Sequence, residues 1–156
     1  MYVPAVAGRI VVGVDGSELG AAALKWALEE AELRQATIVA VHAWTFVPPG
    51  PIAEPGMVPI PAGDLAGDLA AERNIAETIL GDAVAGAAEA GVQVEQRLVE
   101  GSPGDVLVDS ARDADLLVVG SHGRGRFASA LLGSVSHHVL KHAPCPVVVV
   151  RVRSTD

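Results

Sequence analysis

Short runs of apolar residues recur along the chain and predict five β-strands. These runs are Ile10–Val14, Thr37–Ala43, Val92–Val99, Leu116–Val119 and Val147–Val152. Four of them are almost continuous stretches of β-branched or aliphatic residues, the pattern of parallel strands that are covered on both faces. The third run alternates apolar with polar residues, which indicates an edge strand with one face in water.

Helical patterns lie between these strands. Ser17 is placed to cap a first helix, with Glu18 in its first turn, and the apolar residues that follow recur at the spacing of one helix face. Further helices are expected from about Leu65 to Ala90, ended by Gly91, from Ser102–Pro103 onward, with Ser102 as the cap, and from Gly133–Ser134 to Pro144. The alternation predicts an α/β fold: a doubly wound, five-stranded parallel sheet with helices on both faces.

We expect residues 1–156 to form one domain, because the length is close to that of an ordinary domain. Residues 46–63 interrupt the pattern: they contain six of the ten prolines and no regular apolar spacing. Neither flank of this Pro-rich stretch is large enough to fold alone. We therefore interpret it as a long loop after the second strand.

The acidic balance of the chain disfavours several classes of partner. Nineteen Asp and Glu against 11 Lys and Arg give a formal charge of −8, which opposes binding to nucleic acid or to an anionic membrane surface. No apolar run reaches the roughly 18 residues that span a bilayer, and the first residues lack the basic start of a signal peptide. The single cysteine, Cys145, rules out an internal disulfide, so we expect a cytoplasmic protein.

The residues best suited to ligand binding follow the first and fourth predicted strands. In a doubly wound sheet, ligands bind beyond the carboxyl ends of the strands, where the winding reverses. Asp15 places a carboxylate at one such end, and the glycine-rich stretch 120–125 lets backbone amides approach a ligand at the other. Gly133–Ser134 then opens a helix whose free N–H groups attract an anion such as phosphate, and the hydroxyls of Ser134 and Ser136 can add hydrogen bonds. The alternative is a capping Asp15 and a glycine-rich turn before an ordinary helix.

Two widespread phosphate-binding motifs do not fit. A P-loop needs Gly-Lys-Ser/Thr, and neither of the two lysines, Lys25 and Lys141, stands in that context. Residues 123–128 match the dinucleotide pattern G-x-G-x-x-A, but they follow the fourth predicted strand rather than the first. No acid lies about 20 residues further on, where that motif requires one.

Three further sets of residues are interpreted as structural. His138 and His142 have the i, i+4 spacing of two metal ligands, but no third ligand is evident, so we expect a solvated pair. Cys145 lies between two prolines before an aliphatic strand, which favours a buried structural thiol over a nucleophile. Trp26 and Trp44 are expected in the core or in the wall of a crevice.

The spacing of the glycines resembles the nucleotide-binding signature of the universal stress protein family, G-2x-G-9x-G-[S/T]. Gly120 and Gly123 are followed, after nine residues, by Gly133–Ser134. Three other segments in the same order add to the resemblance: Val-Gly-Val-Asp-Gly-Ser at 12–17, Ala-Asp-Leu-Leu-Val-Val-Gly at 114–120, and the ending at 142–150. The resemblance covers nearly the whole chain.

That family implies a Rossmann-like sheet of order 3-2-1-4-5, like that of the adenine nucleotide alpha hydrolases, and ATP binding where the motif is kept. By resemblance, Asp15 would lie near the ribose and phosphates or a Mg²⁺ ion carried by the nucleotide, with Gly13 in the same site, and Val41 would meet the adenine. The other residues implied at the ribose and phosphates are Gly120, Ser121, His122, Gly123, Arg124, Gly125, Arg126, Gly133, Ser134, Val135 and Ser136. The family also implies a homodimer through the last strand, Val147 to Val152.

The leading hypothesis is an ATP-binding regulatory module of the stress response with little or no turnover. The chain lacks a P-loop lysine and shows no water-positioning acid other than Asp15, so fast phosphoryl transfer has no evident machinery. The alternatives are a slow ATPase or nucleotidyl-transfer enzyme, a member of the family that binds cyclic AMP, and an interaction protein with an empty site. The intact motif disfavours the last of these.

Overall fold

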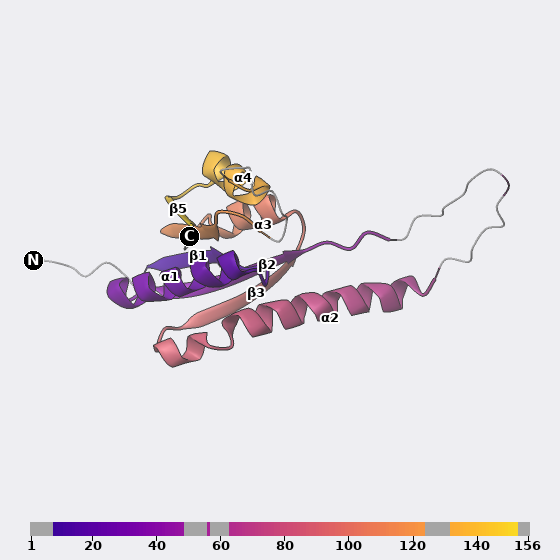
Figure 1. The fold of residues 1–156 in the computed structure, drawn as a ribbon, viewed down its shortest axis with the longest axis horizontal. Helices are drawn as coiled ribbons and strands as arrows, with labels where there is room; N and C mark the ends of the chain where they lie inside the picture. Colours follow the sequence, from indigo (N-terminus) through magenta and orange to yellow (C-terminus); the bar gives the residue numbers. More distant parts are fainter. Residues whose placement is uncertain (1–7, 49–55, 57–62, 124–131, 153–156) are drawn as a thin grey trace, which may run out of the picture.

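Five parallel strands form one sheet in the computed structural model, which describes residues 8–48, 56, 63–123 and 132–152. The strands are β1 (Arg9–Gly13), β2 (Thr37–Trp44), β3 (Val94–Glu100), β4 (Leu116–Gly120) and β5 (Val147–Val150). Their order is β3-β2-β1-β4-β5, and every neighbouring pair is parallel. This confirms the doubly wound sheet of order 3-2-1-4-5, with the alternating third strand at an edge (Figure 1).

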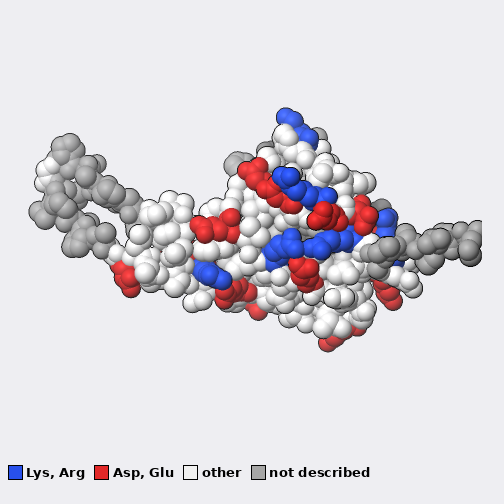
Figure 2. All heavy atoms as spheres, turned by 180° about the vertical axis from the view of Figure 1, so that it is seen from behind, with Lys and Arg blue, Asp and Glu red and all other residues white. Residues whose placement is uncertain are grey.

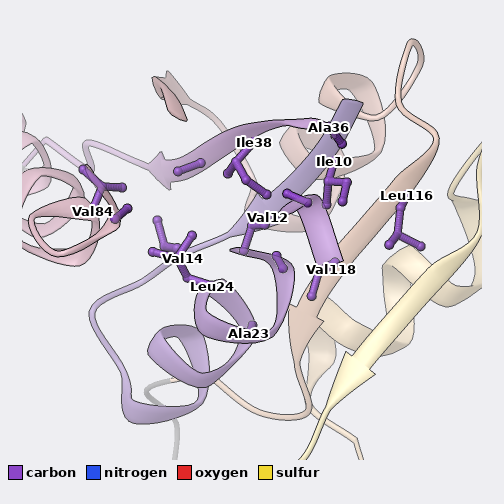
Figure 3. Packing of buried hydrophobic residues seen from close by; sticks show 14 of the residues in the cluster. Ile10, Val12, Val14, Ala23, Leu24, Ala36, Ile38, Val84, Leu116 and Val118 are labelled. Atoms are coloured by element: carbon purple, nitrogen blue, oxygen red, sulfur yellow. The ribbon is translucent and has the colours of Figure 1, made fainter. Parts of the chain in front are cut away.

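Helices cover both faces of the sheet, as expected. They are α1 (Glu18–Arg34), α2 (Leu65–Val84), α3 (Pro103–Ser110) and α4 (Ser134–His142). Side chains from one face of β1, β2 and β4 pack against α1 and α2, and Figure 3 shows part of this cluster. The opposite side chains of the same strands pack against α3 and α4.

The strands and the first helix form for the reasons that the sequence indicates. Strands β1, β2 and β4 are buried on both faces, which accounts for their continuous apolar runs. Ser17 caps α1, because its Oγ accepts a hydrogen bond from the N–H of Gly20 at 3.0 Å. The face of α1 that packs on the sheet includes Leu24, Ala27 and Ala31, all buried.

Several boundaries and one cap differ from the predictions. The ends of β1, β2, β3 and β4 shift by one or two residues, so that β1 ends at Gly13 rather than Val14 and β3 begins at Val94 rather than Val92. The helix expected to reach Ala90 ends at Val84, and a 3-10 turn (Ala87–Ala90) follows, because Gly86 favours helix continuation poorly. Ser102 stands at the start of α3, but its side chain makes no capping hydrogen bond. Strand β5 ends at Val150 rather than Val152, because Val150 pairs with Gly120, the last residue of its neighbour β4.

Two segments about which the sequence makes predictions lie largely outside the described residues. Most of the Pro-rich stretch 46–63 belongs to these segments, as do Arg124, Gly125 and Arg126. Within the part of the chain that is described, no helix is both long and apolar enough to cross a membrane.

The winding of the sheet reverses between β1 and β4, and this reversal creates the place for a site. After β1 the chain passes to β2 on one side, whereas after β4 it passes to β5 on the other. The connections leaving the carboxyl ends of these two adjacent strands therefore diverge, which opens a crevice between them.

Candidate functional site

A cavity of about 540 Å³ lies at the carboxyl ends of β1, β2 and β4. The structure brings most of the predicted site residues to its wall: Gly13, Asp15, Val41, Gly120, His122, Gly123, Gly133, Ser134, Val135 and Ser136. Ser121 is buried beside the cavity without lining it. The sequence thus located three of the four sides of this cavity, those formed by β1, by β4 and by the start of α4.

Asp15 is held by one of its carboxylate oxygens. Its Oδ1 accepts hydrogen bonds from the N–H of Ser17 at 2.9 Å and from the Ser17 hydroxyl. Its Oδ2 lies on the side of Gly123, where a Cβ added to that glycine would come within 2.9 Å of it. Asp15 therefore orders the turn before α1, as expected if its role is structural. It also presents an oxygen at the wall of the cavity.

Two glycines at the strand ends lie directly against helices that pack on the sheet. A Cβ on Gly120 would lie 3.0 Å from main-chain atoms of Leu19, in the first turn of α1. A Cβ on Gly13 would lie 2.9 Å from the side chain of Leu107, on α3. We expected the glycines of the stretch 120–125 to let a ligand approach closely. Gly120 also lets helix α1 approach the sheet, and Gly13 faces α3 in a similar position.

The amino terminus of α4 is fixed to the end of β4 through one carbonyl group. The carbonyl of Ser121 accepts hydrogen bonds from the N–H of Gly133 at 2.7 Å and from the Ser136 hydroxyl at 2.9 Å. The same hydroxyl lies 3.0 Å from the carbonyl of Gly133, so its one hydrogen is directed at main-chain oxygens. The main-chain N–H groups of the first helical turn and the hydroxyl of Ser134, which lines the cavity, remain for an anion, whereas the hydroxyl of Ser136 does not.

The fourth side of the cavity was predicted only in part, through Val41 at the adenine and Trp44 as a wall residue. It consists of the end of β2 and one face of α2, with a contribution from α3: His42, Ala43, Trp44, Thr45, Glu72, Ile75, Ala76, Ile79, Pro103 and Leu107. Trp44 was expected in a core or crevice wall, and it lies in this wall. The sequence does contain a signal for this face of α2, because Glu72, Ala76 and Ile79 recur at the spacing of one helix face.

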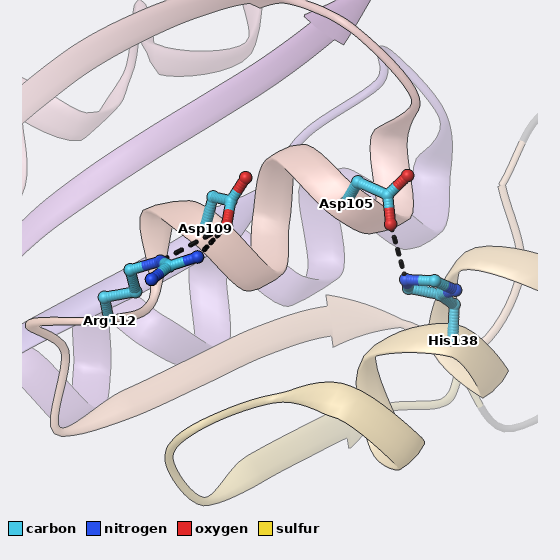
Figure 4. A network of polar contacts seen from close by, with 4 residues as sticks. All are labelled: Asp105, Asp109, Arg112 and His138. Atoms are coloured by element: carbon cyan, nitrogen blue, oxygen red, sulfur yellow. Dashed lines mark hydrogen bonds and ion pairs between the residues drawn. The ribbon is translucent and has the colours of Figure 1, made fainter.

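The histidine pair on α4 has a structural partner. The rings of His138 and His142 lie with their centres 4.7 Å apart. Nε2 of His138 lies 3.0 Å from the carboxylate of Asp105, on α3, which links the two helices (Figure 4). Within the described ranges, no three His, Cys, Asp or Glu side chains are grouped to hold a metal ion.

Burial raises the pKa of the Cys145 thiol, and the charge of Asp115 adds to the shift, so the thiolate is disfavoured.

Acidic and basic side chains are mixed on the face drawn in Figure 2. Oppositely charged side chains among the described residues also form ion pairs, such as Arg97 with Glu95 at 2.8 Å and Arg112 with Asp109 at 2.8 Å. The hydrogen bond from Arg97 lowers the pKa of Glu95. Exposed pairs of this kind contribute little stability. On the face drawn in Figure 2, charges of both signs are mixed among the described residues, and no broad area carries one charge.

Comparison with known proteins places this geometry in context. A sequence model of the universal stress protein family matches residues 7–151. Universal stress protein Rv2623 of Mycobacterium tuberculosis is 38% identical over 142 residues, which are 90% of this chain and 46% of the relative. The chain therefore spans about half the length of the curated relatives that it matches.

Two solved structures resemble this one over almost their full length. A universal stress protein in complex with cAMP has a TM-score of 0.66 and 29% identity, covering 94% of this chain and 98% of the other. The universal stress protein from Archaeoglobus fulgidus in complex with dAMP has a TM-score of 0.64 and 29% identity, covering 94% and 99%.

The packing at Gly120 predicts a large loss of stability from a small substitution. Gly120→Ala forces the Cβ against main-chain atoms of Leu19, which cannot rotate away, and should lower the free energy of unfolding by about 1–3 kcal/mol. Gly81→Ala is the matched control, because its Cβ would meet nothing within 4 Å and alanine favours the helix. Urea denaturation measures both, and equal stability of the two variants would contradict the proposed contact.

Proposed function

Because the chain belongs to the universal stress protein family, we propose that it binds an adenine nucleotide in the cavity where β1 and β4 end. In the cell this nucleotide is ATP with Mg²⁺. One observation carries the proposal: a carboxylate oxygen, a glycine-rich backbone and the amino terminus of a helix line a single cavity of about 540 Å³. The similar proteins whose structures hold cAMP and dAMP support an adenine nucleotide.

The phosphates occupy the start of α4 in this proposal. The N–H groups of Ser134, Val135 and Ser136 have no partner within the helix, and the helix dipole favours an anion at this end. The ribose lies along Gly120–Gly123, and the adenine lies against β2 beside Val41. The family resemblance assigns Arg124, Gly125 and Arg126 to the ribose and phosphates as well.

The Mg²⁺ ion reaches the site with the nucleotide. Mg²⁺ is commonly bound through one or two carboxylates together with substrate phosphates and water. The cavity fits this coordination preference. One carboxylate oxygen of Asp15 is hydrogen-bonded to Ser17, and the other lies toward Gly123. Asp15 would therefore bind the ion on one side, and the phosphates of the nucleotide would bind it on the other.

The proposed role is that of a regulatory module of the stress response, with little or no turnover. Neither Lys25 nor Lys141 lines the cavity, and the acids among the described residues that do are Asp15 and Glu72. Fast phosphoryl transfer usually relies on a group that orients the nucleophile, and neither acid is placed for that role by the resemblance. A slow ATPase or nucleotidyl-transfer enzyme and a cyclic-AMP-binding protein are the alternative functions. A single cysteine suits a reducing compartment, so we place this module in the cytoplasm.

Gly123→Val should lower the affinity for ATP at least about tenfold. The Cβ would come within 2.9 Å of Oδ2 of Asp15 and displace the carboxylate from the cavity wall. Gly86→Val is the control, because Gly86 is exposed and its Cβ would meet nothing within 4 Å. Isothermal titration calorimetry with Mg·ATP and with cAMP measures the affinities. Unchanged affinity in a folded Gly123→Val protein would overturn the placement of the site.

The purified protein should release phosphate from Mg·ATP no faster than a sample without protein. A multiple-turnover phosphate assay, run for several hours at saturating ATP, measures the rate. Mass spectrometry of any ligand that leaves the purified protein on denaturation identifies what it carries. Release of several equivalents of phosphate per chain would favour the slow ATPase instead.

We further propose a homodimer through β5, as the family resemblance implies. This strand stands at the edge of the sheet and pairs only with β4 among the described residues. The carbonyl of Val150 accepts a hydrogen bond from the N–H of Ser121, so the main-chain groups of Val150 face β4. Because these groups alternate along a strand, those of Val149 face the open edge, where a second copy can pair with them.

Val149→Pro should convert the dimer to a monomer without unfolding it. Proline removes the N–H that faces the open edge, whereas the hydrogen bonds to β4 come from the neighbouring residues. Val149→Ala keeps the N–H and should remain dimeric. Light scattering coupled to gel filtration measures the mass. A monomeric wild-type protein at micromolar concentration, or a dimeric Val149→Pro variant, would contradict this interface.

A further inference from the structure

His42 is a buried polar residue that lines the cavity and that the sequence analysis did not select. It lies in β2 directly after Val41, and its side chain and backbone are only 8% exposed. Its Nδ1 is 2.7 Å from the carbonyl oxygen of Val14, the residue that follows β1. The ring is thus fixed to the main chain at the point where β1 leaves the sheet.

This hydrogen bond determines what the other ring nitrogen can do. A carbonyl oxygen only accepts, so Nδ1 carries the hydrogen, and Nε2 of the neutral imidazole is left with a lone pair. Nε2 has no hydrogen-bond partner among the described residues, and it is not sealed from solvent as a buried unpartnered atom would be. The ring, which lines the cavity, therefore carries one acceptor whose orientation is set by the bond to Val14.

The surroundings of His42 suit the base of a nucleotide. Ala43 and Trp44 extend the same strand, and Ile79 contributes an apolar side chain from α2. The titratable side chains that share this cavity are Asp15 after β1, Glu72 on α2 and His122 after β4. The α1 helix contributes only Gly20 to the lining, and α3 only Pro103 and Leu107. The imidazole is thus a polar group within the largely apolar end of the cavity.

We infer that His42 determines the choice of base, with Nε2 accepting a hydrogen bond from the exocyclic amino group of a 6-aminopurine. This inference rests on the proposed function, since it assigns a role within the same cavity. An oxopurine carries a carbonyl oxygen at that position and has no hydrogen there to donate. A site built around such an acceptor rejects the analogue that lacks the donor, because the acceptor is then left unpaired.

The test compares two nucleotides that differ only in that amino group. AMP carries it, and purine riboside 5′-monophosphate has a hydrogen in its place. Wild-type protein should bind AMP about tenfold more tightly, as expected for one net hydrogen bond. Calorimetric titrations at pH 8, above the range in which histidine side chains usually change charge, measure both affinities.

The substitution His42→Asn distinguishes the role of Nδ1 from that of Nε2. The asparagine amide can still donate to the carbonyl of Val14, but it is too short to reach the position of Nε2. The ratio of the two affinities should therefore fall to about one, and His42→Phe, which keeps an aromatic ring but removes both nitrogens, should give the same result. His142→Asn, at an exposed position near the end of α4, is the matched control and should keep the wild-type ratio.

The ratio of the two affinities distinguishes this role from a purely structural one. Loss of a structural role would weaken the binding of both nucleotides equally. A wild-type ratio near one overturns the inference, whether or not the variants fold. A wild-type ratio retained in His42→Asn or His42→Phe overturns it as well, while AMP binding leaves the proposed function in place. If wild-type protein binds neither nucleotide, it is the proposed function that fails.

Discussion

The contact between the first turn of α1 and Gly120 is the constraint on which the cavity depends. Main-chain atoms of Leu19 occupy the space beside the Gly120 Cα, 3.0 Å from where a Cβ would stand. The loop that carries Asp15 and the loop that leaves β4 are brought together by this contact. Gly13 has the same role on the opposite face, against Leu107 of α3. Two adjacent strands thus end in glycine because each admits a helix from a different face of the sheet.

A second constraint brings α4 to the same place. The carbonyl of Ser121 receives two hydrogen bonds, one from the main chain of Gly133 and one from the buried hydroxyl of Ser136. These residues are far enough apart in the sequence that only the folded structure joins them. The Ser136 hydroxyl thereby orders the backbone, and the N–H groups of the first helical turn are left for a ligand in the cavity. Preorganised main-chain donors of this kind need no rearrangement when an anion arrives.

The sequence predicted the elements of this fold well because the determining signals are local. Continuous apolar runs identified β1, β2, β4 and β5, and the Ser17 cap identified the start of α1. The strand order came from the family resemblance, since periodicity alone does not say which strands are neighbours. The wall formed by α2 was missed for the same reason: the spacing of Ile75 and Ile79 indicates a helix face but not what that face contacts. His42 escaped notice because a histidine in an apolar run shows neither its hydrogen-bond partner nor its exposure.

The position of α2 has a consequence for how the cavity can change over evolution. Its buried residues, Ala76, Leu80 and Val84, all belong to its second half, and the helix extends past the end of the sheet (Figure 1). The first half, where Leu65 is 49% and Leu69 is 39% exposed, has little of the core beneath it. Substitutions there remove few packed contacts and so cost little stability. The first half of α2, which adds only Glu72 to the cavity wall, can therefore diversify among descendants, whereas Ala76 and the glycine-lined sides are tied to the core and must be inherited together.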